Sequence, residues 1–217
     1  MPASCLDHSR NGALQSGLYE VYDNSSNRYQ VYCDLKYEPG MAWTLVISQS
    51  FKHRALPQFL SPLFQDTPLN QDTPRWDAYR LSLTRMQQLR SVSTHWRVTC
   101  NFDTEGVLYR DYVRARFNEI DPISLSGKGL CKKVEYMNVR GHNCTGCTAA
   151  WWQFQDSGGQ NIFHHDSSID SCQFGNTPDA APSEDNFGLY VNGNTNSQFR
   201  CTSAGLSTTN HWFGGHV

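Results

Sequence analysis

Long apolar stretches are missing from this sequence of 217 residues, which has no run of about 18 apolar residues. A membrane-spanning helix is therefore excluded, and membrane insertion is not expected. Charge is also scarce: Asp, Glu, Lys and Arg make up 18% of the chain, and 18 Lys and Arg nearly balance 20 Asp and Glu. Because no overall positive charge is available to neutralise a phosphate backbone, nucleic acid is not an expected partner.

The motifs of common enzyme classes are missing too. The chain contains no Gly-x-Ser-x-Gly, no His-Glu-x-x-His and no glycine loop of the phosphate-binding type. Asp166, Asp170, Glu184 and Asp185 could be searched for a glycosidase pair, but their spacing does not distinguish an acid from a base. We therefore expect a protein without catalytic residues, and a hydrolase is the alternative.

Cysteine, in contrast, is abundant. Eight cysteines and many Ser, Thr and Asn residues in a chain of this size indicate an oxidising, extracellular environment. The first residues lack the charged and apolar parts of a signal peptide, so we expect that a leader has been removed. Asn-x-Ser/Thr sequons at Asn24 and Asn143 are the predicted glycosylation sites.

The charge is distributed unevenly along the chain. Residues 1–140 contain 17 Lys and Arg and 14 Asp and Glu, whereas residues 141–217 contain Arg200 alone against six acidic residues. The last third also holds five of the eight histidines. Such a segment is suited to a cation or a neutral polar ligand, although an acidic loop region without a ligand would have the same composition.

Short segments of β-branched and aromatic residues recur between turn signals and predict strands. They span residues 18–22, 28–33, 42–47, 95–100, 106–109, 134–139, 151–154 and 186–191. The turn formers at 23–27 predict a hairpin between the first two strands. A helix is predicted over about 84–91, where Thr84 and Gln87 fit a capping box. From residue 155 onward the composition predicts long ordered loops.

The amino-terminal segment carries a recognisable series of motifs. These are Cys5, Ser16-Gly17-Leu18-Tyr19, Val31-Tyr32-Cys33-Asp34 and Gly40-Met41-Ala42-Trp43-Thr44. Over roughly residues 5–47 this order resembles the opening of fibrinogen C-terminal-like domains, which intelectins share in part. The resemblance implies a secreted domain that binds glycans, acetylated groups or protein ends, commonly with a structural calcium ion near the ligand, and often as an oligomer.

The last third departs from that family. Its calcium loop has the form Asp-x-Asp, and its tryptophan pair follows the loop, whereas here the nearest segment is 163–172 and Trp151-Trp152 precedes it. The next cysteine after Cys172 is Cys201, much farther along than the family spacing. The family's ligand pocket therefore cannot be transferred residue by residue, and the chain looks like a divergent branch.

Asp166, Ser168 and Asp170 are the predicted calcium ligands. Two carboxylates four residues apart, with hydroxyls and backbone carbonyls between them, can surround a hard cation with oxygen atoms, and the resemblance implies calcium here. A solvated polar loop is the alternative. His164 and His165 could instead join Asp166 in a transition-metal site, although adjacent strand residues point to opposite faces.

All eight cysteines are expected to form disulfides. Cys144 and Cys147 form a C-x-x-C pair, but the second pair of a zinc site and the context of a redox motif are missing. Cys5–Cys33 can close a small amino-terminal lobe and is the first predicted pair, and Cys172–Cys201 is the second. Connectivity among the remaining four is left open: Cys100, Cys131, Cys144 and Cys147.

The predicted ligand-binding residues are His164, His165, Tyr190, His211 and Trp212. A saccharide offers C–H faces and hydroxyls, so its site needs an aromatic plane beside polar side chains or calcium. His211 and Trp212 are favoured because the surrounding residues 207–210 and 214–215 resemble loops. Core packing is the alternative for each aromatic residue.

Together these features predict one fibrinogen-like recognition domain of the α+β class over residues 1–217. It would comprise an amino-terminal disulfide lobe (5–47), a central sheet region (48–140) and a loop-rich ligand and calcium region (141–217). The predicted function is calcium-assisted binding of carbohydrate or glycoprotein surfaces outside the cell, with a homo-oligomer as a further expectation. An adhesion module that binds protein without a glycan site is the alternative.

Overall fold

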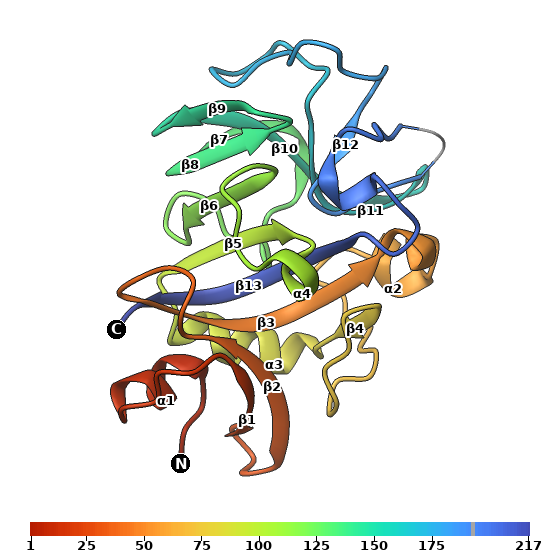
Figure 1. Ribbon diagram of the computed structural model, residues 1–217. Helices are drawn as coiled ribbons and strands as arrows, with labels where there is room; N and C mark the ends of the chain where they lie inside the picture. Colours follow the sequence, from red (N-terminus) through yellow and green to blue (C-terminus); the bar gives the residue numbers. More distant parts are fainter. Residues whose placement is uncertain (192–193) are drawn as a thin grey trace.

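Over residues 1–191 and 194–217, which the computed structural model describes, the chain forms two antiparallel sheets and a few short helices (Figure 1). Within these residues the larger sheet has the strand order β1-β2-β3-β13-β5-β6-β8-β9, and β4 pairs with β3. Its strands are β1 (Gly17–Tyr22), β2 (Arg28–Asp34), β3 (Met41–Ser50), β4 (Ala78–Arg80), β5 (His95–Cys100), β6 (Tyr112–Arg116), β8 (Tyr136–Val139), β9 (His142–Thr145) and β13 (Thr208–His216). The predicted α+β class with an antiparallel core is confirmed.

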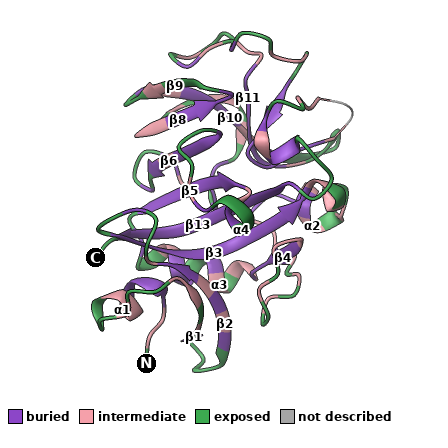
Figure 2. Cartoon of the chain, viewed as in Figure 1, coloured by how far each residue is buried: buried purple, intermediate pink, exposed green. Residues whose placement is uncertain are grey.

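The smaller sheet has the strand order β12-β11-β10-β7. Its strands are β7 (Gly127–Lys133), β10 (Thr148–Asp156), β11 (Gly159–Asp166) and β12 (Asp185–Asn186). Trp151 of β10 stacks on Phe163 of β11 at a ring-centroid distance of 4.5 Å, and its ring also lies 5.5 Å from that of Trp96 on β5. These aromatic contacts join the two sheets in one core, and Figure 2 shows the central strands as largely buried.

The longest helix in the described part of the chain is α3 (Leu83–Ser91), close to its predicted span. The other helical elements are α1 (Cys5–Arg10), η1 (Phe51–His53), α2 (Pro57–Leu60), α4 (Phe102–Glu105) and η2 (Arg200–Thr202). The amino-terminal cap of α3 is Ser82, whose hydroxyl accepts a hydrogen bond from the backbone N–H of Arg85 at 3.4 Å. The predicted capping box at Thr84 is therefore wrong, because Thr84 lies inside the first turn.

Strand β13 lies in the middle of the large sheet, between β3 and β5 (Figure 1). The loop predicted over 207–210 and 214–215 is thus wrong from Thr208 onward. Ladders to β3 and β5 on its two sides hold these turn-forming residues in an extended conformation. Gly214 is required there because a Cβ atom would lie 2.1 Å from the carbonyl oxygen of Ala42.

Two other predicted strands also differ. Residues 106–109 precede β6 and are not a strand, because Gly106 has φ +66°, outside the range of strand residues. A Cβ atom at this position would also lie 2.3 Å from the ring of Tyr37. Of the predicted strand 186–191, only Asn186 belongs to a strand, β12. Phe187 and Tyr190 are nevertheless buried, so the apolar pattern reflected core packing rather than extended pairing.

A buried ion network connects the end of β2 to β5 and β6. Arg97 is fully buried and donates to Asp34 at 2.6 Å and to Glu38. Glu38 also accepts hydrogen bonds from the Tyr112 hydroxyl at 2.7 Å and from Arg114 at 3.0 Å. Burial by itself would raise the pKa of Asp34, but the charge and hydrogen bonds of Arg97 outweigh it and lower that pKa.

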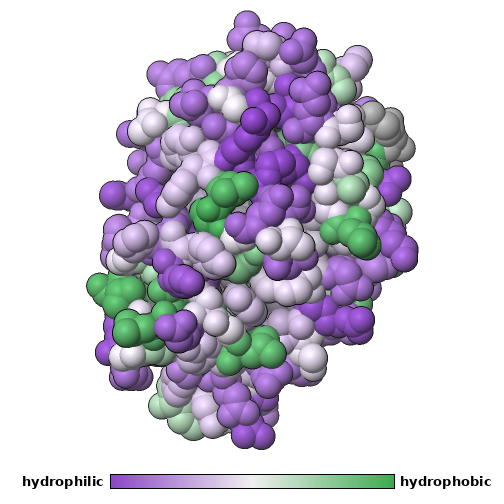
Figure 3. Space-filling view, in the orientation of Figure 1, coloured by the Kyte–Doolittle hydropathy of each residue, from purple (hydrophilic) through white to green (hydrophobic). Residues whose placement is uncertain are grey.

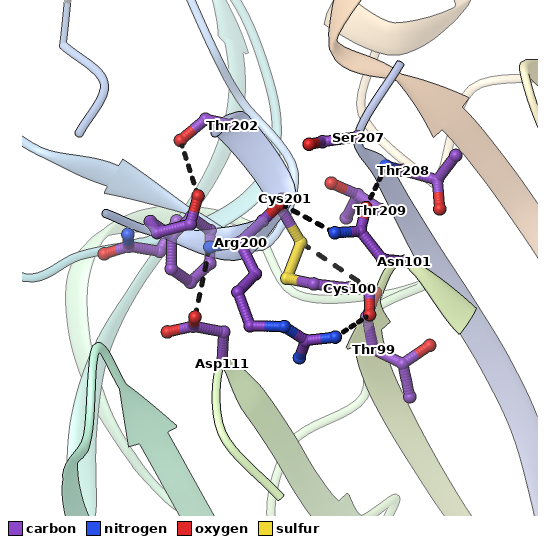
Figure 4. The surroundings of a disulfide bond; sticks show 12 residues. Thr99, Cys100, Asn101, Asp111, Arg200, Cys201, Thr202, Ser207, Thr208 and Thr209 are labelled. Carbon is purple, nitrogen blue, oxygen red and sulfur yellow. Dashed lines mark hydrogen bonds between the residues drawn. A yellow bond between two sulfur atoms is a disulfide. The ribbon is translucent and has the colours of Figure 1, made fainter. Parts of the chain in front are cut away.

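All eight cysteines are paired, as predicted, and Cys5–Cys33 is confirmed. The predicted Cys172–Cys201 pair is wrong: the other disulfides are Cys100–Cys201, Cys131–Cys172 and Cys144–Cys147. Cys201 lies in η2, which packs against β5, whereas Cys172 lies beside β7 of the smaller sheet. Figure 4 shows Cys100–Cys201 beside Arg200, which donates to the carbonyl oxygen of Cys100 at 3.0 Å and whose backbone N–H donates to Asp111.

One face of the molecule is mainly polar. In the view of Figure 3, hydrophobic residues form small green patches separated by hydrophilic ones. In the part of the chain that the structure describes, there is no helix with the length and apolarity needed to span a membrane.

Candidate ligand-binding sites

The predicted calcium ligands are only partly brought together. Asp166 ends β11, and its carboxylate accepts hydrogen bonds from the backbone N–H of Ser168 at 2.7 Å and from the Ser168 hydroxyl at 2.6 Å. Asp170 is exposed and directs its carboxylate toward Gly175. The predicted loop therefore places Asp166 and Ser168 in contact, whereas Asp170 has a different neighbour.

Asp185 is the carboxylate that the structure places opposite Asp166. The two residues are paired across β11 and β12, and both are about 93% buried. Burial, together with the neighbouring charge of Asp166, raises the pKa of Asp185 to about 7. Although Asp185 was considered in the sequence only as a glycosidase carboxylate, its cross-strand position makes it an oxygen donor beside Asp166.

An oxygen-rich set of this kind suits calcium chemically. Asp166, Asp185 and Ser168 would supply hard oxygen ligands, and the two carboxylates carry negative charge into a buried position. Across the described residues, no three His, Cys, Asp or Glu side chains lie close enough to hold a metal ion together. Calcium held here would therefore need backbone or water oxygens in addition to these side chains.

His164 and His165 are both buried on β11. His164 donates from Nδ1 to the carbonyl oxygen of Ile162, and His165 donates from Nδ1 to that of Ala150, each at 2.7 Å. Burial lowers the pKa of both imidazoles to about 4, so they are neutral at pH 7. Only His164 approaches the carboxylate pair, with its Nε2 3.5 Å from Asp185.

The other three predicted ligand residues lie inside the core. Tyr190 shares a hydrogen bond of 2.8 Å with Thr209, and the indole N–H of Trp212 donates to Thr99 at 2.9 Å. His211 is 97% buried on β13. The loop interpretation that favoured His211 and Trp212 is corrected by their place in the central strand, where neither side chain reaches the surface.

The two predicted glycosylation sites are on the surface. Asn24 is exposed in the turn between β1 and β2, and Asn143 is exposed on β9. Both positions are sterically open to a glycan, and their modification stays a prediction.

A second candidate site lies on the polar face of β6 and β8. We call it the β6–β8 groove, and it consists of three adjoining hollows of about 440, 470 and 470 Å³. Its lining includes Arg90, His95, Tyr109, Tyr112, Arg114, Arg116, Glu119, Lys133, Glu135, Tyr136, Thr145 and His216. The hollow beside Arg90 shares Arg116 with the middle hollow, and the middle hollow shares Arg114 and Glu135 with the hollow beside Tyr109. The three hollows therefore form one continuous surface.

Strand geometry brings the groove residues together. Tyr112, Arg114 and Arg116 alternate along β6 and therefore share one face, over a length of about 13 Å. Tyr136 of β8 lies directly across from Arg114, and Thr145 of β9 lies next to Tyr136. The opposite face of β6 contributes buried Val113 and Ala115 to the core, so this strand is anchored from behind.

Tyrosines form one end of the groove. The ring of Tyr109 lies 5.1 Å from that of Tyr112 and 6.3 Å from that of Tyr136, in both cases edge to face. Tyr109 is 48% exposed, whereas Tyr112 is buried beneath it. The Tyr136 hydroxyl donates to the carbonyl oxygen of Tyr109 at 3.1 Å. These contacts hold an exposed aromatic surface in a fixed orientation.

Charged side chains form the middle of the groove. Glu135 accepts hydrogen bonds from the Nε atoms of Arg114 and Arg116 at 2.9 and 2.8 Å, and lies 3.3 Å from the His95 imidazole. Burial by itself would raise the pKa of Glu135, but its hydrogen bond to Arg116 and the charges around it lower that pKa. Glu135 is therefore ionised at neutral pH and positions both arginines.

The far end of the groove is cationic. Arg90 donates from Nε to Asp121 at 2.8 Å, and its guanidinium lies 4.6 Å from the centre of the Phe117 ring. Arg90, Arg116 and His216 line the same hollow. Sequence reasoning missed this groove because residues 112–116 were not identified as a strand, although their alternation of aromatic, apolar and basic residues is a strand pattern.

Known proteins resemble this chain in structure rather than in sequence. No family model and no curated protein matches the sequence. Among solved structures, the chain is similar to the fibrinogen-like globe domain of human ANGPTL6, with 13% identity, a TM-score of 0.44 and a match covering 100% of this chain and 96% of that one. It is also similar to the fibrinogen-like globe domain of human ANGPTL2, with 15% identity, a TM-score of 0.42 and complete coverage of both chains. The resemblance predicted from residues 5–47 agrees with this likeness of fold.

Proposed function

We propose that this chain is an extracellular, non-catalytic recognition domain that binds carbohydrate in the β6–β8 groove. The observation that carries the proposal is the continuous surface on which the exposed ring of Tyr109 adjoins the charged side chains of Arg114, Arg116 and Glu135. A sugar ring stacks its C–H face on an aromatic plane, and its hydroxyls take hydrogen bonds from guanidinium and carboxylate groups. Hollows of this size hold small ligands.

The surroundings of Glu135 in the groove support binding rather than catalysis. A glycosidase needs one carboxylic acid with a raised pKa to protonate the leaving oxygen. Glu135 has the opposite environment, because Arg116, Arg114 and His95 stabilise its ionised form. Glu135 is suited to position arginines and to accept a hydrogen bond from a sugar hydroxyl, and it is not suited to donate a proton.

The disulfides support an extracellular location. Four disulfides that use all eight cysteines are typical of a protein in an oxidising environment. Weak single carbohydrate sites gain affinity when several copies act together, so a homo-oligomer would suit this function.

Calcium is the cofactor of this proposal, held by Asp166, Asp185 and Ser168 at the end of β11. It would neutralise two buried carboxylates and so stabilise the loops after β11. The test is the melting temperature with calcium and with EDTA, which should fall in EDTA. An unchanged melting temperature together with no calcium by elemental analysis would remove calcium from the account.

A glycan array at high protein density tests the function directly. We expect saccharide binding that Tyr109→Ala weakens by about fivefold or more, because the stacking surface is lost. Leu18→Ala is the matched control, since Leu18 is similarly exposed but lies on β1 at the other end of the large sheet. If no saccharide binds, the carbohydrate function is wrong and a protein-binding adhesion module takes its place.

A further inference from the structure

We infer that the β6–β8 groove selects acidic saccharides, with Arg116 and Arg90 binding a carboxylate or sulfate group while Tyr109 and Tyr136 contact a sugar ring. This inference rests on the proposed function and names the class of its ligand. It is carried by the charge of the groove, by the way its arginines are held and by their position relative to the tyrosines.

The groove is positive on a chain that is slightly negative overall. Its charged residues are the cations Arg90, Arg114, Arg116 and Lys133 and the anions Glu119 and Glu135. The residues that line the groove therefore carry two more positive than negative charges, and Asp121 and Glu38, which accept hydrogen bonds from Arg90 and Arg114, lie outside this lining. The hollow between Arg90 and Arg116 has no acidic side chain in its lining. Such a local charge favours an anionic ligand.

Arg116 is positioned to bind an anion. It donates to Glu135 only from Nε, and its side chain is 58% exposed, so the outer edge of its guanidinium faces the groove or solvent. Two parallel N–H groups of a guanidinium match the oxygens of a carboxylate or sulfate. Because Glu135 already orients Arg116, little side-chain entropy is lost when a ligand binds.

Arg90 is held in a similar way on the other side of the same hollow. Its Nε donates to Asp121, and its guanidinium packs over Phe117, which leaves the side chain 35% exposed. Arg90 and Arg116 therefore present two oriented guanidinium groups to one hollow. A ligand with acid groups can be contacted from both sides.

The arrangement favours a saccharide over an acidic peptide. The groove lies on the face of the sheet, where β6 already has β5 and β8 as neighbours, so a peptide could not extend the sheet there by strand pairing. Tyr136 lies across from Arg114, about 7 Å along β6 from Arg116, and the exposed ring of Tyr109 lies a further 6.3 Å from that of Tyr136. A chain of sugars with an acid group can reach both ends.

The experiment compares one sulfated oligosaccharide with its desulfated form, using the full chain and isothermal titration calorimetry. We expect the sulfated form to bind about tenfold or more tightly, and this preference to shrink at high salt. Arg116→Gln should weaken binding of the sulfated form about tenfold and affect the desulfated form less. Arg28→Gln is the matched control, because Arg28 is an exposed arginine that pairs with one glutamate on β1.

The failures of the two proposals are distinguishable. Equal affinity for the two forms would overturn acid selection and leave carbohydrate binding in place, whereas binding of neither form would overturn both. Binding of a polyglutamate peptide as tightly as the sulfated saccharide, unaffected by Tyr109→Ala, would overturn the choice of a saccharide. If Arg116→Gln is unstable, Arg116→Lys keeps the charge and removes the planar fork, and it should still lose most of the preference.

Discussion

Two buried carboxylates, Asp34 in the first part of the chain (1–140) and Asp185 in the last part (141–217), have pKa values shifted in opposite directions. Asp34 is paired with Arg97, which holds its pKa below the usual value. Asp185 faces Asp166, and burial together with that neighbouring charge raises its pKa to about 7. The first environment is already balanced and holds strands together, whereas the second is negative and would gain from a bound cation.

The two candidate ligand sites differ in their charge in the same way. The balanced network continues from Arg97 through Glu38 to Arg114, so it supports the β6–β8 groove from below. The uncompensated carboxylates lie at the end of the smaller sheet. We infer that the basic first part of the chain binds the ligand and that the acidic last part holds calcium, so calcium stays where the composition suggested a cation and the ligand does not.

The largest expected loss of stability comes from removing the disulfide that links the first part of the chain (1–140) to the last part (141–217). Removing Cys100–Cys201 by double substitution to alanine should cost about 4.7 kcal/mol in unfolding free energy, because the bond closes a loop of about 100 residues. Removing Cys5–Cys33, with a sequence separation of 28, should cost about 1 kcal/mol less. Urea unfolding of both variants measures the difference, and a larger loss for Cys5–Cys33 would contradict this assignment.

Arg97→Met should remove the cation that balances the buried charges of Asp34 and Glu38. We expect a loss of about 3–5 kcal/mol in unfolding free energy, because Asp34 and Glu38 would remain buried without their shared cation. Arg28→Met is the control and should cost about 1 kcal/mol or less, since its ion pair is exposed. Equal losses in the two variants would show that the Arg97 network does not stabilise the fold in this way.

Asp185→Asn should change the free energy of unfolding in the opposite direction, toward greater stability. Without calcium, the variant should be about 1–2 kcal/mol more stable than the parent at neutral pH, because one of two facing buried carboxylates becomes neutral. With calcium, the parent should gain stability and the variant should not. Thermal melts of both proteins with calcium and with EDTA measure this, and an equal calcium effect in both would exclude Asp185 as a ligand.

Glu135→Gln should cause the smallest change in the free energy of unfolding. The pKa of Glu135 is lowered in the folded protein, so its contribution is complete above its ordinary value of 4.5 and disappears as pH falls through the lowered value. We expect the variant to be about 1 kcal/mol less stable at pH 7 and equal to the parent in strong acid. Two melting curves that stay parallel from neutral to acid pH would contradict this linkage.

The sequence predicted the parts of the fold that depend on short-range patterns. The hairpin of β1 and β2, helix α3 and the Cys5–Cys33 bond involve residues close in the chain or a local alternation of side chains. Strand β13 was missed because its Thr, Asn and Gly residues have low strand preference on their own. Pairing with β3 and β5, which come from far earlier in the chain, overrides that preference.

The candidate sites were harder to predict for the same reason. Asp166 was identified, but its partner Asp185 is supplied by a strand of only two residues. The burial of Trp212 and His211 could not be separated from exposure on a loop without knowing the place of β13. Arg114 and Arg116 were overlooked because their site depends on β5, β6 and β8 lying side by side.

A crystal structure of the full chain with calcium and a sulfated disaccharide is the most direct test of this division of roles. Our account predicts the sugar in the β6–β8 groove, with its sulfate at Arg116 and its ring against the tyrosines, and calcium between Asp166 and Asp185. Saccharide bound at Asp166 and Asp185, with the β6–β8 groove empty, would contradict it.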